Sequence, residues 1–203
     1  MARPGGYSAI SSHSRVTILH ALQSRPRRTV AELCDETGLH ANTVREHLQR
    51  LADAGYVVLA TERRTTRGRP RVLYSAATGE DAASSAVARD RVRAAAERGD
   101  LMRRVIPETD GGALPGDAVH QLDALVDDLG AAGFDAVVDE DALTIDLTPC
   151  AYAAAQPEQR ERLCSVHVAL MQGVLTEAGG PLVVDGMVPA CDPAQCVIQL
   201  GTR

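Results

Sequence analysis

Apolar residues recur at helical spacing in three short segments near the start of the chain. The first covers about residues 15–22, and Pro26 interrupts the pattern because proline disfavours a helix interior. A capping box at Thr29-Val30-Ala31-Glu32 predicts the start of a second helix, which Gly38 ends. A third helix is predicted over about residues 41–54. The inward positions are Val16, Ile18, Leu19, Leu22, Val30, Leu33, Cys34, Val44, Leu48 and Leu51.

Two β-prone segments follow, at residues 56–59 and 72–74, and the segment 63–71 between them carries five arginines. Two helices joined through a glycine and followed by a basic hairpin are typical of a winged helix-turn-helix. The alternative is a solvated charged turn. The position of the arginines, at the loop where a wing belongs, favours contact with nucleic acid.

The middle of the chain, residues 79–104, is rich in alanine and arginine and predicts one helix, broken at Gly99 or shortly after. Its apolar stripe is weak, so we expect this helix to lie against a partner subunit. Proline and glycine residues between 107 and 116 predict a linker.

After Asp117 the hydrophobic period alternates between helix and strand in the order α-β-β-α-β-β. We therefore predict an α+β protein: an N-terminal winged helix-turn-helix and a C-terminal domain with one antiparallel sheet, covered by helices on one face. The predicted domains are 1–78, 79–116 (helix and linker, with a possible dimer contact) and 117–203. The C-terminal elements are a helix from 117 to Gly130 or Gly133, strands 134–138 and 143–147, a helix 158–177, and strands 182–184 and 196–200.

Composition and charge add a functional contrast between the two halves. The chain is 45% apolar and 24% charged, ordinary for a globular protein, and it has neither a transmembrane run nor a secretory leader, so we expect a cytoplasmic protein without a membrane partner. Residues 1–78 hold 12 arginines and 6 acidic residues, whereas residues 79–203 hold 9 arginines and 21 acidic residues. This split predicts a basic module that binds a polyanion and an acidic module with another role.

Four of the five cysteines, Cys150, Cys164, Cys191 and Cys196, lie in the last 54 residues, and Cys34 lies in the basic half. Without an export signal, structural disulfides are disfavoured, and the cluster favours a metal or redox site. The spacing C-x13-C-x26-C-x4-C is neither a pair of zinc knuckles nor a ferredoxin run, so buried thiols and a regulatory disulfide stay open. On a helix, His167 shares a face with Cys164 and Met171.

Several runs between residues 12 and 78 carry a family resemblance: residues 43–51 (TVREHLQRL), Gly55-Tyr56-Val57, and Gly68-Arg69-Pro70 before Tyr74. In order and spacing they resemble ArsR/DeoR-type winged-helix repressors. The resemblance implies a third helix in the major groove, a wing on phosphate or in the minor groove, and a dimer on palindromic double-stranded DNA. His47 is open between a packed residue and a DNA contact. The implied groove-facing residues are His40, Asn42, Thr43, Arg45 and Glu46, and the implied backbone contacts are Arg50, Arg63, Arg64, Arg67 and Arg69.

The C-terminal half carries a second resemblance, in Pro149-Cys150, in residues 163–173 (LCSVHVALMQG) and in the closing Cys196-Val197-Ile198-Gln199-Leu200. These segments resemble the output domain of SufR-like iron–sulfur repressors. The resemblance implies a [4Fe-4S] or [2Fe-2S] cluster whose state controls the DNA affinity of a homodimer. Cys150 and Cys164 match its cysteines, and the third match is Cys191 or Cys196. The expected ligands are all four C-terminal cysteines, with His167 as the alternative fourth.

Two other function classes compete with this reading. A winged-helix regulator with structural zinc or a thiol switch in the same place is the main alternative, because thiolates bind zinc as readily as iron. An enzyme is disfavoured, since the sequence has no P-loop, no G-x-G-x-x-G after a strand and no H-E-x-x-H. We therefore expect a regulator of transcription that is not an enzyme.

Overall fold

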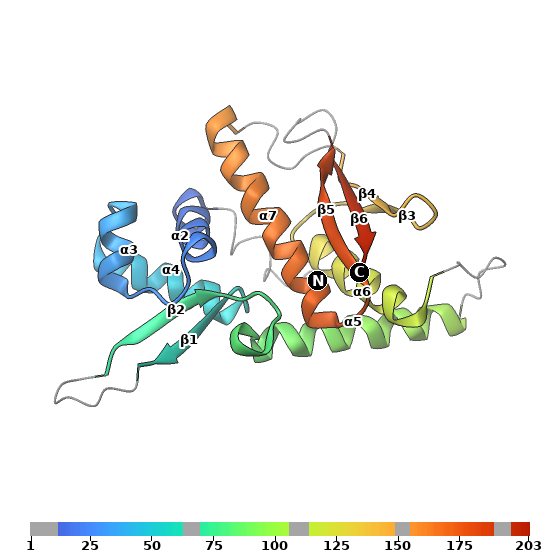
Figure 1. Cartoon of the computed structure of the whole chain (residues 1–203), viewed down its shortest axis with the longest axis horizontal. Helices are drawn as coiled ribbons and strands as arrows, with labels where there is room; N and C mark the ends of the chain where they lie inside the picture. The colour runs from blue at the N-terminus through green and yellow to red at the C-terminus, as the bar shows by residue number, and fades with distance from the viewer. Residues whose placement is uncertain (1–11, 63–69, 106–113, 149–154, 189–195) are drawn as a thin grey trace.

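The described residues of the N-terminal part form three helices and a two-stranded hairpin (Figure 1). The structure is a computed structural model that describes residues 12–62, 70–105, 114–148, 155–188 and 196–203. The three predicted helices and both predicted strands of this part are confirmed. They are α2 (His13–Ser24), α3 (Val30–Thr37), α4 (Ala41–Asp53), β1 (Val57–Thr61) and β2 (Val72–Ala76).

Local sequence signals set the ends of α3 as predicted. The Thr29 hydroxyl oxygen accepts a hydrogen bond from the Glu32 N–H, and the Glu32 carboxylate accepts one from the Thr29 N–H, which completes the capping box. Gly38 follows the last turn in the left-handed region, where its N–H donates to the Cys34 carbonyl. The short connection to Ala41 then sets α3 and α4 as a helix-turn-helix pair.

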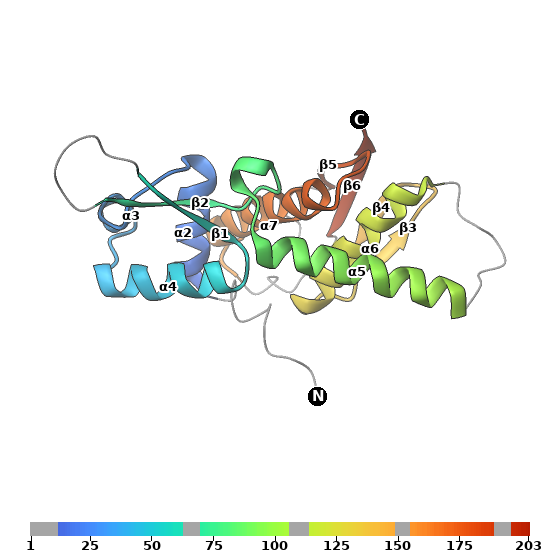
Figure 2. The same cartoon turned by 90° about the horizontal axis from the view of Figure 1, so that it is seen from below.

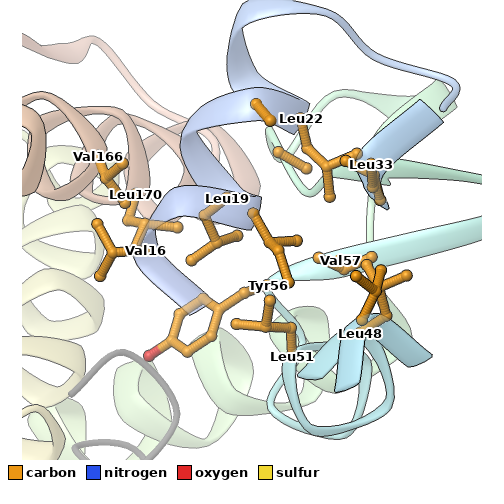
Figure 3. Close-up of a cluster of buried hydrophobic side chains, with 14 residues drawn as sticks. Val16, Leu19, Leu22, Leu33, Leu48, Leu51, Tyr56, Val57, Val166 and Leu170 are labelled. Carbon is orange, nitrogen blue, oxygen red and sulfur yellow. The ribbon is translucent and has the colours of Figure 1, made fainter. Parts of the chain in front are cut away.

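A first hydrophobic core lies among α2, α3, α4 and the hairpin (Figure 3). Ile18, Leu19 and Leu33 are fully buried there, as the helical periodicity predicts. The core also contains Val166 and Leu170, which belong to a helix more than 100 residues further along the chain. The N-terminal fold is therefore completed by a C-terminal element.

The predicted helix over residues 79–104 is confirmed from residue 86 onward, but it starts later than predicted and the predicted break at Gly99 is wrong. A short 3-10 turn, η1 (Asp81–Ala83), precedes the helix α5 (Ala86–Val105), and α5 continues through Gly99 without a break. A Cβ at position 99 would collide with the Asp123 carboxylate, so this glycine allows close approach of two helices rather than ending one.

The helix that Gly99 approaches is α6 (Gly116–Ala131), and α5 packs against α6 and against α7 (Pro157–Ala178) of the same chain. The weakly apolar face of α5 thus packs against helices of the same chain. The sequence had predicted contact with a partner subunit instead. Arginines of α5 face carboxylates of α6 along the contact. The pairs are Arg91–Asp128 at 3.3 Å, Arg98–Asp127 at 2.6 Å and Arg103–Asp123 at 2.8 Å.

The elements after Gly116 follow in the order helix, strand, strand, helix, strand, strand. The four strands among the described residues of this half pair antiparallel in one sheet with the spatial order β3-β4-β6-β5. Alternate residues such as Ile145, Ile198 and Leu200 are buried beneath α6 and α7, so one face of the sheet packs on helices. The strands are β3 (Val137–Asp139), β4 (Thr144–Asp146), β5 (Leu182–Val188) and β6 (Val197–Thr202).

Helix α7 belongs to both cores and lies between the N-terminal helices and the sheet (Figures 1 and 2). Its residues Val166 and Leu170 pack against the first core, whereas Met171 and Leu175 are buried in the second. The Gln23 side chain of α2 also donates a hydrogen bond to the Val166 carbonyl at 3.4 Å. Among the described helices, none is both long and apolar enough to span a bilayer.

Candidate functional site

The exposed face of α4 is the candidate DNA-reading surface. Its buried face, formed by Val44, Leu48 and Leu51, packs on the first core, which turns the remaining positions outward. His40 stands just before the helix as its N-cap, and its Nδ1 accepts a hydrogen bond from the Asn42 N–H. Thr43 is half-buried and the other predicted DNA-contacting residues of this helix are exposed, namely His40, Asn42, Arg45, Glu46 and Arg50.

Two side-chain pairs hold the arginines of this face. Arg45 Nη1 donates to Asn42 Oδ1 at 3.0 Å, and Arg50 Nη2 donates to Glu46 Oε1 at 2.6 Å. All four side chains are exposed, and exposed pairs of this kind contribute about 0–1 kcal/mol. Both guanidinium groups can therefore exchange these partners for DNA at low cost.

One exposed residue of this face was not among the predicted contacts. Gln49 lies seven positions after Asn42, which places it on the same side of α4. Its Nε2 donates to Asp53 Oδ1 at 2.7 Å. Helical spacing from Asn42 was a signal in the sequence that could have found it, and an amide is a suitable partner for adenine.

His47 packs toward the protein. It is half-buried, and its Nδ1 is buried and has no hydrogen-bond partner among the residues that the structure describes. Burial, with the nearby Arg15 guanidinium, lowers the pKa of His47. This favours the packed interpretation over a groove contact.

The hairpin that carries the predicted wing is in register up to its tip. Strand β1 pairs with β2 from Val57↔Ala76 to Thr61↔Val72, and the Glu62 N–H donates to the Arg71 carbonyl at 2.8 Å. One end of the hairpin, at Val57 and Ala76, lies in the first core, and the other end, at Thr61 and Val72, is exposed. The four wing arginines, Arg63, Arg64, Arg67 and Arg69, lie outside the described residues, so their DNA contacts stay a prediction.

Two of the four predicted cysteine ligands lie in the described part of the chain. Cys164 is on α7 and is 7% exposed, and Cys196 precedes β6 and is 4% exposed. The Cys196 carbonyl accepts a hydrogen bond from the Leu147 N–H, and its own N–H donates to the Thr148 hydroxyl. Cys150 and Cys191 lie outside the described residues.

His167, the alternative fourth ligand, is buried one helical turn after Cys164. Its ring stacks on Phe134, with 4.7 Å between the ring centroids and 19° between the planes. Burial lowers the pKa of His167 to about 4, so the imidazole is neutral at pH 7. The side chain therefore has a structural role in packing α7, and its role as a ligand stays a prediction.

Within the described ranges, no group of three or more His, Cys, Asp or Glu side chains is placed to hold a metal ion. Because two of the predicted cysteines are not in those ranges, the ligand set is not tested. Cys34, which we expect to take no part, lies on α3 and packs half-buried against the first core.

Three helices with an exposed third helix and an adjoining two-stranded hairpin define a winged helix-turn-helix, a class of DNA-binding domain. Residues 12–58 match the family model described as "Bacterial regulatory protein, arsR family". This part of the chain is an ArsR-family helix-turn-helix domain, and the chain is a DNA-binding transcription regulator.

One solved structure with sequence similarity is titled "Crystal structure of the predicted DNA-binding transcriptional regulator from E. coli". The identity is 32%, and the match covers 37% of this chain and 72% of that chain, with a TM-score of 0.29. No curated protein matches the sequence.

Proposed function

We propose that the chain is a homodimeric transcription regulator whose C-terminal cysteines bind an iron–sulfur cluster, and that the state of this cluster sets its affinity for DNA. The observation that carries the proposal is the double role of α7. The same helix holds Cys164, on its second turn, and the side chains Val166 and Leu170 that complete the core of the DNA-binding part.

The DNA-binding step rests on α4 and the wing. The exposed Arg45 has the geometry for a bidentate contact with guanine once it leaves Asn42, and Asn42 and Gln49 offer amides to adenine. Arg50 and the wing arginines supply positive charge to the phosphates. In a two-fold dimer the two α4 helices would read the halves of a palindromic operator.

The cluster would be held by Cys150, Cys164, Cys191 and Cys196, with His167 as the alternative to one of the last two. The donor set fits, since thiolates are the ligands that iron–sulfur clusters take in proteins. Cys164 and Cys196 are both buried; Cys164 lies on α7, which contacts β5, and Cys196 immediately precedes β6 of the same sheet. When bound, the cluster would supply a group that responds to oxidation, nitric oxide or iron supply.

The signal would pass through the chain's own packing. A change of ligation at Cys164 shifts α7, and Val166 and Leu170 transfer the shift to Val16 and Leu19 of α2 (Figure 3). Since protein cores are close-packed, such a displacement moves the neighbouring helices instead of being absorbed. This would change how α4 is presented to DNA, which is a two-state coupling between the sites.

The dimer has a candidate contact at the end of α5. Leu101, Met102 and Val105 are 59%, 54% and 67% exposed, although large apolar side chains are usually covered. Arg103 and Arg104 lie between Met102 and Val105 in the sequence. We assign this end of α5 to contact with a second copy of the chain.

The test of the cluster is purification without oxygen, followed by absorption spectra, EPR and analysis of iron and sulfide. A brown protein with iron and sulfide supports the proposal, and a colourless protein with zinc supports the structural-zinc alternative. Cys164→Ser should lose the iron. Cys34→Ser is the matched control and should retain it, because Cys34 packs on the other core. Full iron content in Cys164→Ser would contradict the ligand assignment.

A further inference from the structure

The C-terminal end of the recognition helix is held by one residue of α5. Arg91 Nη1 donates a hydrogen bond to the carbonyl of Ala54, the C-cap of α4, at 3.1 Å. Arg91 Nη2 lies 3.3 Å from Asp128 Oδ1 on α6, and its Cζ lies 5.4 Å from the ring centroid of Tyr56. A single guanidinium therefore contacts α4, the start of the hairpin and α6.

The contact with Ala54 suits the chemistry of a helix end. The last carbonyls of a helix have no partner within it, and they form the negative end of the helix dipole. A cationic donor at this position satisfies one of these carbonyls and is attracted to the dipole. Arg91 thus adds a polar contact at the end of α4 where Leu51 and Ala54 pack on the first core.

The contact with Asp128 keeps Arg91 in place. Asp128 Oδ1 is buried and makes no hydrogen bond with a described residue, so the ion pair with Arg91 is what compensates its charge. Burial raises the pKa of Asp128, and it also raises the pKa of Tyr56 to about 12. The side chains of Arg91 and Asp128 are 30% and 13% exposed, so their attraction is less weakened by water than that of a fully exposed pair.

A pocket lies beside this contact. Tyr56, Arg91, Asp128 and Leu170 are among its lining residues, and its empty volume is about 490 Å³, including space open to solvent. Beside it, a Cβ on Gly79 would collide with the backbone of α7 at Gly173 and Glu177. The residues around Arg91 therefore join the DNA-binding part to the C-terminal helices.

We propose that Arg91 is a positioning residue for DNA recognition: with Asp128 it latches the C-terminal end of α4 to α5 and α6 and so sets the orientation in which α4 meets DNA. The inference rests on the DNA-binding function and does not need the cluster. It adds a second connection to α4, separate from the packing of α7 on α2.

The same two helices supply a matched control. Arg98 pairs with Asp127 at 2.6 Å between α5 and α6, as Arg91 pairs with Asp128, but its side chain is 56% exposed and its described ion pair stays between these two helices. Removing Arg98 deletes an α5–α6 ion pair without touching Ala54. Any effect specific to Arg91 then belongs to the contact with α4.

The experiment measures the preference of the full chain for one DNA duplex over another. The specific probe is a duplex enriched from a randomised pool by the wild-type protein, and the reference is an unrelated duplex of equal length. We expect Arg91→Ala and Asp128→Asn each to lower the ratio of the two affinities about 10-fold, within the range of coupled contacts. The double variant should be no worse than the more affected single variant, and Arg98→Ala should stay within about 2-fold of wild type.

A melting curve separates positioning from stability. Asp128→Asn removes a charge that burial disfavours, and it leaves the Arg91 side chain, which is 30% exposed, in reach of water. It should therefore not lower the melting temperature even though it lowers the affinity ratio. Ratios at the wild-type value in both Arg91→Ala and Asp128→Asn would overturn the latch alone. A wild-type protein that enriches no duplex would overturn the latch together with the DNA-binding function on which it rests.

Discussion

At the scale of single residues, the face of α4 follows directly from its periodicity. Burial of Val44, Leu48 and Leu51 fixes which side chains point outward, so Asn42, Arg45 and the missed Gln49 could all be placed from the sequence. Arg91 could not. Arg91 lies 37 positions from Ala54 and 37 positions from Asp128. Its contacts with both depend on tertiary packing, which the sequence pattern does not reveal.

Replacing Arg45 with alanine should remove sequence preference while leaving the fold intact. Arg45 is exposed and its only described hydrogen bond is to Asn42, so the free energy of unfolding should change little. A bidentate contact with guanine contributes about 1–3 kcal/mol of discrimination. Competition gel shifts with single-base variants of the enriched duplex measure the loss. Arg93→Ala, an equally exposed arginine on α5, is the control, and an Arg45→Ala protein with wild-type preference would show that the recognition helix is misassigned.

Asp128 predicts a pH dependence of stability. Burial raises its pKa above the ordinary value of about 3.9, so in the folded state the ionised form is disfavoured. As the pH rises above about 4, the unfolded chain loses this proton first, and the group then lowers the stability of the fold. The melting temperature of Asp128→Asn should therefore rise relative to that of the wild type as the pH increases from 4. Parallel curves for Asp128→Asn and wild type would contradict the assignment.

At the scale of elements, most of the fold follows from local signals. The capping box at Thr29, the cap at Gly38 and the alternation in β4 and β6 each act over a few residues, and the structure has these elements where the pattern predicts them. Gly99 is the counterexample. A glycine within a helix normally weakens it. At position 99 the close approach of the Asp123 carboxylate explains the glycine, because it leaves no room for a Cβ.

The wing is an element whose DNA role can be tested by salt dependence. Replacing Arg64 or Arg67 with alanine should weaken binding to the enriched and the unrelated duplex alike, because phosphate contacts carry no sequence information. Each lost phosphate contact should make the slope of log K against log salt less negative by about 0.9. Fluorescence anisotropy at several salt concentrations gives the slope. If both variants keep the wild-type slope, the hairpin between β1 and β2 does not contact phosphate.

At the scale of the whole molecule, charge and hydrophobic pattern divide the chain into a basic and an acidic half, and the structure joins the halves through α7. Periodicity shows that α7 has apolar residues around it, but it does not show that Val166 and Leu170 serve one core while Met171 and Leu175 serve the other. The cysteine spacing likewise predicts a shared site, but it does not predict how the ligands are arranged, because they come from separate segments. The proposed coupling depends on this shared helix.

The most direct test of that coupling is the affinity of one protein preparation for the enriched duplex, measured without oxygen before and after removal of its iron. We predict that the dissociation constants with and without the cluster differ by at least about 5-fold, the lower end of typical allosteric coupling. Cys164→Ser should bind DNA like the iron-free wild type, and Cys34→Ser should behave like wild type in both states. An iron- and zinc-free protein that binds the duplex with the same affinity as the loaded protein would contradict the account.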